Sequence, residues 1–416
     1  MSNLFDTLKD RGYIYQSTDI DRIKDILNGE PTTYYLGIDP TADSLHIGHF
    51  FALMMFRHLQ DHGHKGIIVI GGATALIGDP SGKKDMRKVL TKEQVAKNIE
   101  EVKTIVKKFV KTDGDNPAII TNNADWITPY NFIDFMREVG IHFNVNKMLS
   151  ADAYSTRLEE GGLTFLEMSY MLMQAYDFVH LNRTYGCKIQ IGGSDQWGNL
   201  VAGVTLNRKL NNVSENTAIE GDLFGLTCPL LMTNDGKKMG KTESGALWVE
   251  KDKTSAFDFY QYFYNVNDDD VEMLMKLFTR IDLDVISELI GSDIIKAKKT
   301  MAYEITKLVH GEAEADDVMK AIKSLYSGNT NLDTVPSYTI DKNLLNEGVG
   351  LLDLLEMAGL APTKSEGRRN VTQGGVSING EKVTDPKYVV TEKDIDQESG
   401  VILLKRGKKN FVKIDF

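Results

Sequence analysis

The stretch that decides the fold is Thr33–His49, which reads TYYLGIDPTADSLHIGH. Its first six residues, 33–38, are mostly aromatic or aliphatic and predict a short buried strand. The polar residues and the proline that follow indicate a turn, and the apolar pattern of Ser44–Leu59 predicts a helix. A strand that leads through a turn into a helix is the repeating unit of a parallel sheet covered by helices.

The same alternation continues through the first half of the chain. Strand-like runs occupy Lys65–Ile70, Ala118–Thr121 and Cys187–Ile191, and helical patterns occupy Lys92–Phe109 and Leu166–Leu181. Glycine pairs directly follow two of these strands, at the carboxyl ends where open α/β sheets bind nucleotides. The expected fold class is therefore α/β, with a Rossmann-like doubly wound parallel sheet.

The second half changes character twice. From about residue 254 the pattern is almost wholly helical, with helices predicted at Ser255–Tyr264, Asp269–Phe278, Leu283–Ile290, Ile294–His310 and Ala313–Tyr326. A polar stretch near residues 328–337 indicates a linker. Helical segments at Val349–Met357 and Ser365–Gln373, with a hairpin signature at Val376–Val383, then predict a small α+β unit.

We therefore expect five segments along the chain. These are a Rossmann-like domain at 1–228, a connector at 229–254, a helical domain at 255–328, a linker at 329–346 and a small α+β domain at 347–416.

Composition places the chain among folded, multidomain proteins. It has 416 residues, of which 42% are hydrophobic and 26% are charged. Two cysteines are too few for a disulfide framework or a zinc cage. No apolar run is long enough to cross a bilayer, and the start of the sequence lacks a signal-peptide pattern. We therefore expect a cytoplasmic protein.

The net charge does not decide whether the partner is a nucleic acid. The total is -11, whereas nucleic-acid binders are often basic. The segment Ala361–Phe416, however, has eleven Lys and Arg residues against eight Asp and Glu residues, so it carries about +3. Phosphates are bound by a local patch rather than by the whole protein, but an excess this small is also ordinary scatter.

The first candidate motif is the pair His46 and His49, with Gly48 between them. It lies where a strand turns into a helix, so the free N–H groups and the dipole of the helix start favour a phosphate. The two histidines face the same side of the first turn and could donate hydrogen bonds to a phosphoryl group. Gly48 lets a flat base or ribose approach the backbone. Two unrelated surface histidines or two metal ligands are also compatible with the pattern, although no third ligand stands out nearby.

The second motif is a lysine loop, Gly236–Thr242, which reads GKKMGKT. Lysines with glycine and a hydroxyl suit a mobile clamp on a triphosphate, but a solvated basic loop is the commoner explanation of such a run. Its spacing is not that of a Walker loop, and neither is that of Gly78–Lys83. The dinucleotide fingerprint is also missing after the early strands. These absences argue against a P-loop ATPase and a dehydrogenase.

The third motif is a polar stripe on an otherwise apolar helix. Thr164 and Glu167 predict a capping box at its start. Most of the following positions are apolar, yet Tyr170, Gln174 and Asp177 lie at i, i+4 and i+7 on one face. Such a stripe needs a partner, because burying unpaired polar groups is unfavourable. The partner could be solvent or a ligand with an ammonium group and a phenolic hydroxyl.

Taken together, these motifs resemble the class I aminoacyl-tRNA synthetases. His46–His49 and Lys238–Thr242 are similar to the two signatures of that family in order and separation. Other segments resemble the bacterial-type tyrosyl branch in particular: Gly37–Thr41, Gly71–Thr74, Gly78–Lys83 and Gly192–Asn199. The tail, with Gly367–Arg369 before Gly374–Val376 and Asn379-Gly380, is similar to an S4-like RNA-binding module. The resemblance covers essentially the whole chain.

The resemblance implies an activity and a set of tyrosine-binding residues. The enzyme would activate L-tyrosine with ATP to tyrosyl-adenylate and pyrophosphate, and then transfer tyrosine to the 3'-terminal adenosine of tRNA(Tyr). The resemblance implies that Tyr35 and Asp177 form hydrogen bonds with the phenolic hydroxyl of tyrosine. It also implies that Tyr170, Gln174 and Asp79 bind the ammonium group of tyrosine, and that Gln190 and Gln196 lie near its carboxylate.

The resemblance also assigns the nucleotide and its partners. Asp195 would bind the ribose, Gly37, Gly48 and Gly193 would allow close backbone approach, and Asp39 would order the site. The phosphates would be contacted by Thr41, His46, His49, Lys83, Arg87, Lys238, Lys241 and Thr242. Mg²⁺ is expected on the ATP phosphates, and a homodimer is implied.

Two departures and three rivals qualify this expectation. The second signature has glycine and threonine where the general class I pattern has two serines, a version that is usual in the tyrosyl branch, and Ala52 replaces a larger or hydroxylated residue near the nucleotide. The rivals are a tryptophanyl-tRNA synthetase, a small-molecule nucleotidyltransferase, and an S4-type RNA-binding protein with an inactive synthetase body. Intact signatures argue against the last, and the tail argues against the first two.

Overall fold

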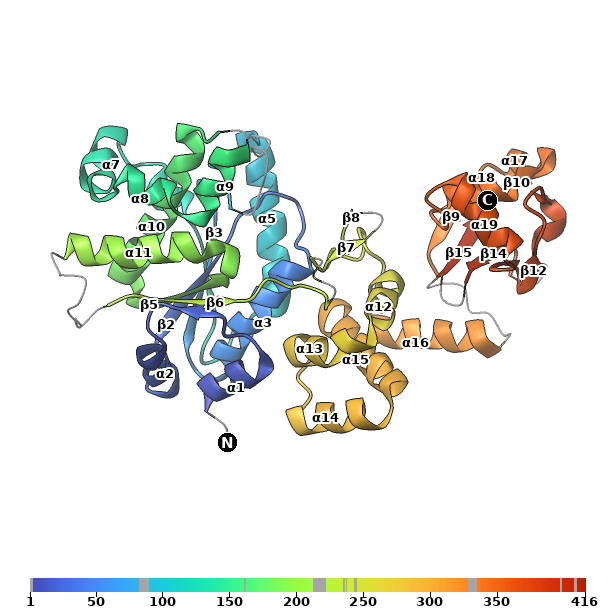
Figure 1. Ribbon diagram of the computed structural model, residues 1–416, viewed down its shortest axis with the longest axis horizontal. Coiled ribbons are helices and arrows are strands. Elements are labelled where there is room, and N and C mark those ends of the chain that lie inside the picture. The colour runs from blue at the N-terminus through green and yellow to red at the C-terminus, as the bar shows by residue number, and fades with distance from the viewer. Residues whose placement is uncertain are drawn as a thin grey trace. The chain divides into compact units, whose positions relative to one another are not determined.

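The computed structural model describes residues 3–81, 90–160, 162–211, 222–234, 236, 238–242, 245–327, 335–396, 399–407 and 410–416 (Figure 1). The chain divides into two compact units. The first comprises Met1–Gly240 and Glu272–Glu288, and the second comprises Lys241–Val271 and Leu289–Phe416.

A six-stranded sheet forms the centre of the first unit. Its order is β1-β6-β5-β2-β3-β4, and the five strands from β6 to β4 run parallel. The bounds are β1 Gln16–Ser17, β2 Thr33–Ile38, β3 Lys65–Ile70, β4 Ile119–Asn122, β5 Cys187–Gly193 and β6 Phe224–Cys228. The expected Rossmann-like parallel sheet is therefore confirmed. The short antiparallel edge strand β1 and the fully buried β6 were not predicted.

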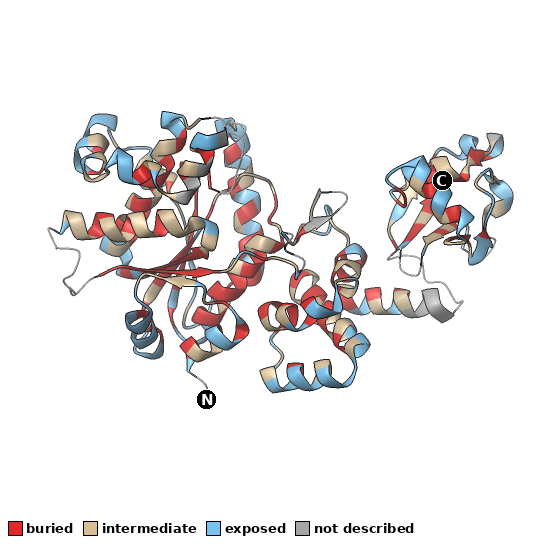
Figure 2. Ribbon diagram, in the orientation of Figure 1, coloured by how far each residue is buried: buried red, intermediate tan, exposed pale blue. Residues whose placement is uncertain are grey.

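Helices cover both faces of this sheet (Figures 1 and 2). Their bounds are α1 Leu4–Arg11, α2 Ile20–Asn28, α3 Ile47–Asp61, α4 Thr74–Ile77, α5 Lys92–Phe109, α6 Ala124–Ile127, α7 Phe132–Glu138, α8 Val145–Leu149, α9 Asp152–Glu160, α10 Phe165–Tyr185 and α11 Trp197–Leu210. Tyr34 packs against Phe56 of α3, whereas its neighbour Tyr35 packs against Phe178 of α10. Because successive strand residues point to opposite faces, α3 and α10 lie on opposite sides of the sheet.

The long helix α10 begins at the capping box that the sequence predicts. The Thr164 hydroxyl oxygen accepts from the backbone N–H of Glu167, and the Glu167 carboxylate accepts from the backbone N–H of Thr164. Arg157 of α9 forms a buried ion pair with the same carboxylate at 2.9 Å. These contacts fix the start of the helix that carries the polar stripe.

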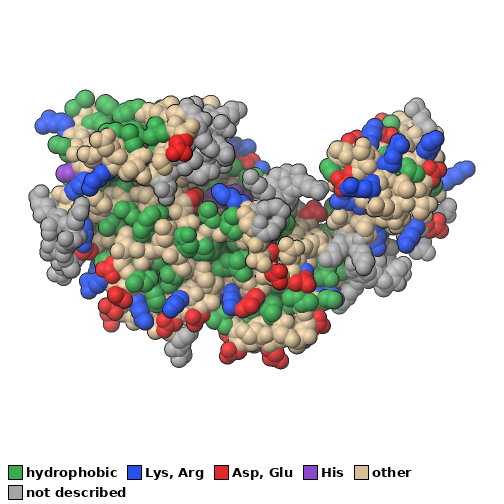
Figure 3. Space-filling view, viewed as in Figure 1, with side chains coloured by type: hydrophobic (Ala, Val, Ile, Leu, Met, Phe, Trp, Pro, Cys, Tyr) green, Lys and Arg blue, Asp and Glu red, His purple; other side chains and the backbone are tan. Residues whose placement is uncertain are grey.

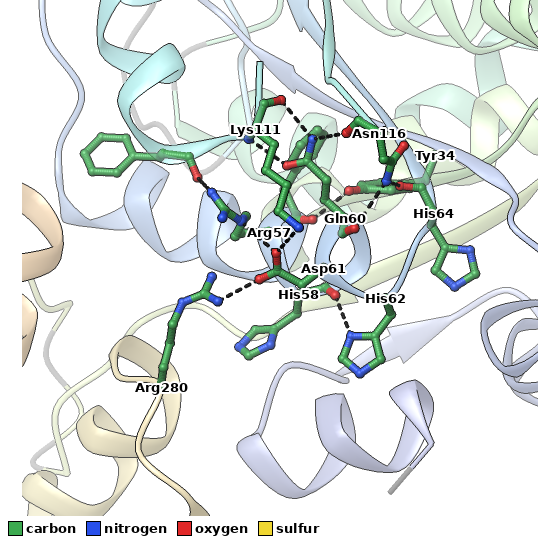
Figure 4. A network of polar contacts seen from close by, with 12 residues as sticks. Tyr34, Arg57, His58, Gln60, Asp61, His62, His64, Lys111, Asn116 and Arg280 are labelled. Atoms are coloured by element: carbon green, nitrogen blue, oxygen red, sulfur yellow. Dashed lines mark hydrogen bonds and ion pairs between the residues drawn. The ribbon is translucent and has the colours of Figure 1, made fainter. Parts of the chain in front are cut away.

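The segment Glu272–Glu288 is held in the first unit by a network of ion pairs (Figure 4). Asp61, the last residue of α3, pairs with Arg57 at 3.0 Å, with Lys111 at 2.7 Å and with Arg280 at 2.6 Å. Burial by itself raises the pKa of Asp61, but hydrogen bonds from these three cations outweigh it and hold the pKa well below its usual range. Arg11 donates to three backbone carbonyls of the same segment, those of Lys276, Thr279 and Ile281.

The predicted helices after residue 254 are all present. Their bounds are α12 Ala256–Tyr264, α13 Asp268–Phe278, α14 Leu283–Ser292, α15 Ile294–His310 and α16 Glu312–Ser327. α12 packs against α15 and α16 in the second unit. No helix within the described ranges is both long and apolar enough to cross a membrane.

The tail is a small α+β structure with its own apolar core. A five-stranded sheet has the order β12-β11-β14-β15-β9, and β10 pairs with β13. The bounds are β9 Ser337–Thr339, β10 Val349–Gly350, β11 Val376–Ile378, β12 Glu381–Val383, β13 Val389–Val390, β14 Ile402–Arg406, β15 Asn410–Asp415, α17 Lys342–Glu347, α18 Leu351–Met357 and α19 Lys364–Thr372. The predicted hairpin is confirmed, with Asn379 and Gly380 both at positive φ in its turn.

Two details of the tail differ from the sequence expectation. Ser337–Thr339, expected within the linker, is a strand that pairs in parallel with β15, and Ile340 and Leu345 enter the tail core. A three-residue polar strand carries almost no pattern of its own, because its partner lies at the far end of the chain. Residues 349 and 350, expected to be helical, form β10, and the helix starts at Leu351. Residues 329–334 of the expected linker lie outside the described ranges.

Candidate active site

The candidate site lies at the carboxyl ends of the parallel strands. β2 pairs with β3 on one side and with β5 on the other, so the strand order reverses next to β2. In open α/β sheets, ligands bind at such a reversal. Asp39 follows β2, Gly71 and Gly72 follow β3, and Ser194–Gln196 follows β5. The sequence motifs that end these strands therefore meet at one edge of the sheet.

Three buried polar atoms on this side of the sheet lack a hydrogen-bond partner among the described residues. They are the Tyr35 hydroxyl of β2, Oε1 of Gln190 of β5 and Oε1 of Gln174 of α10. Tyr35 and Gln190 are register neighbours on adjacent strands, and each residue is only 1% exposed. Because buried polar groups are almost always paired, three unpaired atoms from three elements indicate a ligand site.

Asp177 of α10 lies in the same region and is buried. One carboxylate oxygen accepts from Nδ2 of Asn123 at 3.0 Å, and the other accepts from Nε1 of Trp126 at 2.7 Å. Burial raises the pKa of Asp177 to about 7, with a further contribution from the charge of Asp39, although the two donors oppose this shift. Burial, followed by the charge of Asp177, raises the pKa of Tyr35 well above its usual value, so Tyr35 remains a hydrogen-bond donor.

Asp39 connects the polar stripe of α10 to the strand ends. Its carboxylate accepts from the Tyr170 hydroxyl at 3.0 Å and from the Thr74 hydroxyl at 2.7 Å. Asn123 donates to the Thr74 oxygen at 3.0 Å as well as to Asp177. A continuous chain of hydrogen bonds therefore runs from Tyr170 through Asp39, Thr74 and Asn123 to Asp177.

Thr74, Asn123 and Trp126 are functional candidates that the sequence reasoning missed. Asn123 is fixed in turn, because its Oδ1 accepts from the backbone N–H of Ala73 at 2.8 Å. A signal was available, since a polar run with a tryptophan directly follows the strand β4. Residues in that position lie at the same carboxyl edge as Asp39.

Asp79 and Gln196, both predicted, are brought together from different elements. Gln196 donates from Nε2 to Asp79 at 2.6 Å, and Asn199 donates to Oε1 of Gln196 at 3.1 Å. The backbone N–H of Ser81 donates to the other Asp79 oxygen at 2.9 Å. These bonds fix the Asp79 carboxylate beside the loop that follows β5.

The glycines of the expected nucleotide site differ in their surroundings. A Cβ on Gly193 would lie 2.6 Å from Oδ1 of Asp195, so a side chain there would push this carboxylate away. Gly37 has open space where a Cβ would stand, and its backbone is exposed although it lies in a central strand. Both features leave room for a ligand against the strand ends.

His46 and His49 begin helix α3. Nδ1 of His46 accepts from the backbone N–H of Gly48 at 3.1 Å, and Nδ1 of His49 accepts from the backbone N–H of His46 at 3.2 Å. An accepting Nδ1 leaves Nε2 as the nitrogen that carries the proton. The ring centroids lie 3.9 Å apart. The two imidazoles can therefore present N–H donors beside a helix N-terminus, which is an arrangement that suits an anion.

The lysine loop approaches this helix start. Gly240 has φ +82°, and a Cβ built on it would lie 2.3 Å from Cγ2 of Ile47, the residue after His46. Lys238 is exposed at the start of this approach. The conformation explains why glycine stands here, because a serine would be strained in the backbone and would collide with Ile47. Thr41 lies in the turn before α3, where its N–H donates to the Asp39 carbonyl at 2.8 Å.

Four predicted residues contribute no side-chain geometry. Lys83 and Arg87 lie outside the described residues. Lys241 and Thr242 form the short strand β7, Lys241–Thr242, which pairs with β8, Gly245–Ala246, but their side chains lie outside what the structure describes.

Comparison with known proteins gives a consistent result. Residues 27–327 match the family model for class I tRNA synthetases (W and Y), and residues 329–414 match the model for a tyrosine–tRNA ligase SYY-like C-terminal domain. The chain is 49% identical over its whole length to the whole tyrosine–tRNA ligase of Clostridium botulinum (strain Alaska E43 / Type E3). It is 50% identical to that of Clostridium perfringens (strain 13 / Type A), over 100% of this chain and 99% of that protein.

A solved structure also resembles the chain. A C-terminally truncated mitochondrial tyrosyl-tRNA synthetase of Aspergillus nidulans superposes with a TM-score of 0.68 at 30% identity. The match covers 78% of this chain and 94% of that one.

Proposed function

The chain belongs to the class I tRNA synthetases of the tryptophan and tyrosine group, and we propose that the site described above performs the two steps of a tyrosine–tRNA ligase. In the first step a carboxylate oxygen of tyrosine attacks the α-phosphorus of ATP, the bond to the β-phosphate breaks, and pyrophosphate leaves. In the second step a ribose hydroxyl of the terminal adenosine of tRNA(Tyr) attacks the carbonyl carbon of the tyrosyl-adenylate, and AMP leaves.

The unpaired Tyr35 hydroxyl opposite the Asp177 carboxylate is the observation that carries the choice of tyrosine. A phenol can accept a hydrogen bond from Tyr35 and donate one to Asp177. Phenylalanine would fill the same space but leave the Tyr35 hydroxyl buried without a partner and deprive the Asp177 carboxylate of one hydrogen bond, which is expensive. This pair therefore supports selection for tyrosine against phenylalanine.

The remaining polar groups suit the amino-acid end of the substrate. Asp79, Gln174 and Tyr170 supply acceptors for the ammonium group, and Gln196 lies beside Asp79, near the carboxylate. The resemblance also assigns Gln190 to the carboxylate. Because Gln190 is the register neighbour of Tyr35, we assign it instead to the phenol end of the site.

ATP, as its Mg²⁺ complex, would lie across the strand ends. Asp195 would hold the ribose, and Gly37, Gly48 and Gly193 would allow the nucleotide to approach the backbone. The Nε2–H groups of His46 and His49 and the start of α3 would bind the phosphates. Further phosphate contacts would come from Thr41, Lys83, Arg87, Lys238, Lys241 and Thr242.

The chemistry needs no strong base. The tyrosine carboxylate is already ionised at neutral pH, so catalysis depends on holding it in line with the α-phosphate. Donors and cations stabilise the charge that develops on the phosphoryl oxygens. No single contact of this kind is sufficient, so the histidines and the lysine loop must act together.

The tail would contact the tRNA through its exposed cations. These include Arg368, Arg369, Lys382, Lys387 and Lys393, and Figure 3 shows Lys and Arg side chains spread over this part of the chain. Such residues bind the phosphate backbone without reading sequence.

An exposed apolar surface supports a homodimer. Phe132 is 63% exposed, Ile141 74% and Phe165 65%, and hydrophobic side chains gather over α7 and α8 (Figure 3). Large exposed apolar patches mark association surfaces, and a two-fold pair buries the same patch on both copies. Phe165→Asp should convert a dimer into monomers in sedimentation velocity. A dimer of unchanged strength would place the interface elsewhere.

The activity is tested by tyrosine-dependent exchange of labelled pyrophosphate into ATP. Purified protein, Mg²⁺ and each of the twenty amino acids are supplied in turn. Tyrosine alone should support exchange, and tRNA(Tyr) should then be charged. Exchange with tryptophan instead of tyrosine would overturn the proposal. A lack of exchange with every one of the twenty amino acids would overturn it too.

A further inference from the structure

One aromatic side chain outside the expected site residues is linked to the tyrosine site through a stacked pair. Trp126, on the one-turn helix α6, donates from Nε1 to the Asp177 carboxylate at 2.7 Å. The face of the same indole stacks on the ring of His180, with centroids 4.5 Å apart and an interplanar angle of 14°. Asp177 and His180 lie three residues apart on α10, so the indole spans both side chains on one face of that helix.

The indole needs support in two directions if it is to hold Asp177. A hydrogen bond weakens steeply when the donor turns away from the acceptor, and a helix of only four residues, Ala124–Ile127, is a weak anchor. The hydrogen bond fixes one edge of the indole, and the contact with His180 fixes its plane. The indole also packs against an apolar cluster that includes Phe178 and Leu181, and the flat contact with His180 adds a ring that helps to set the direction in which Nε1–H points.

His180 is suited to this role as a neutral ring. Burial, and then the nearby charge of Arg183, lowers its pKa. A neutral imidazole lying flat on an indole is a favourable offset-stacked pair. The other contacts of His180 are weaker than its stack on Trp126. The Thr184 hydroxyl lies 3.4 Å from Nε2 of His180, and the centroid of the Tyr176 ring lies 6.3 Å from that of His180.

We propose that His180 is a positioning residue for tyrosine recognition, which holds Trp126 so that its N–H fixes the Asp177 carboxylate where the substrate hydroxyl is bound. The inference rests on the proposed tyrosine–tRNA ligase function. It does not require His180 to touch the substrate, and it assigns the residue an effect on tyrosine rather than on ATP.

The test uses pyrophosphate exchange with the full-length protein and five single variants. His180→Ala removes the stacked ring, whereas His180→Phe keeps a flat ring. Trp126→Phe keeps the stack but removes the donor. Tyr185→Ala is the matched control, because it removes an exposed aromatic ring from the same helix. His180→Gln repeats the first change if the alanine variant folds poorly.

His180→Ala should raise KM for tyrosine roughly 2- to 13-fold, the range that an aromatic pair of this geometry is typically worth, and leave KM for ATP unchanged. His180→Phe should restore most of the loss, and Tyr185→Ala should behave as the parent. In the Trp126→Phe background, His180→Ala should add nothing, because the group through which it acts is already gone.

Three results would overturn the inference: equal changes in both KM values, no rescue by the flat ring, or an additive effect in the Trp126→Phe background. A parent protein that shows no tyrosine-dependent exchange would instead refute the proposed function itself. The two failures are therefore distinguished within one experiment.

Discussion

Replacing Tyr34 or Tyr35 by phenylalanine removes the same hydroxyl group at adjacent positions, but the two changes should affect different properties of the protein. Both are buried in β2, and they point to opposite faces of the sheet. The Tyr34 hydroxyl donates to the carbonyl of Phe56 at 2.6 Å. The Tyr35 hydroxyl makes no hydrogen bond with any described residue.

Removing each hydroxyl should therefore affect a different property. Tyr34→Phe loses an intramolecular hydrogen bond and should lower the free energy of unfolding by about 0.5–1.5 kcal/mol, with KM for tyrosine unchanged. Tyr35→Phe breaks no hydrogen bond with any described residue and therefore should not lower the free energy of unfolding. It should weaken tyrosine binding by about 0.5–1.5 kcal/mol, or roughly 2- to 13-fold in KM.

Urea denaturation and pyrophosphate exchange, measured on the same preparations, check the two effects. The Tyr35→Phe protein should also use phenylalanine relatively better, because one fewer buried group is left unpaired by that substrate. Equal destabilisation of the two variants, with KM for tyrosine at the parent value in Tyr35→Phe, would contradict both expectations.

Three further predictions follow from single contacts. Because burial raises the pKa of Asp177 to about 7, its ionised form is lost below that pH, so kcat/KM for tyrosine should fall there; Asp177→Asn should flatten this part of the pH profile. Asp61→Asn should lower the free energy of unfolding at pH 7 by about 1–3 kcal/mol. Since the Asp61 pKa is depressed in the folded protein, this difference should shrink as acid below about pH 4 protonates the unfolded chain, which urea titrations at several pH values would detect. Gly240→Ala should reduce kcat much more than Gly236→Ala, because both have positive φ but only a Cβ on Gly240 meets Ile47; equal losses in single-turnover kinetics would exclude the collision as the cause.

The parts of the fold that follow from local patterns could be read from the sequence. Lys65–Ile70 and Lys92–Phe109 have the bounds that the sequence predicts, because one ends in the apolar run Ile67–Ile70 and the other begins at a capping box. The hairpin at Asn379-Gly380 follows from turn chemistry in the same way.

The strands that the sequence did not predict depend on partner strands that lie far away in sequence. β1 and β9 are two and three residues long, and each exists because a distant strand, β6 or β15, offers hydrogen bonds. No periodicity can reveal such a strand. The boundary between the linker and the tail therefore cannot be predicted from the sequence alone.

The candidate site was predicted unevenly for a related reason. The stripe of Tyr170, Gln174 and Asp177 is visible in a helical repeat, but its ligand only becomes plausible once β2 and β5 bring Tyr35 and Gln190 to the same face. Asn123 and Trp126 carry no motif. Only their place directly after β4 could have pointed to them, and the structure makes them candidates by showing that they hold the two oxygens of Asp177.

The re-entry of Glu272–Glu288 into the first unit has a consequence for biosynthesis. A chain emerging from the ribosome cannot finish this unit when Gly240 appears, because Arg11 still lacks its carbonyl acceptors and Asp61 still lacks Arg280. The ring of Phe278 that stacks on Phe50 also arrives late. The nascent first unit therefore stays incomplete until Glu272–Glu288 has been translated and has left the ribosome.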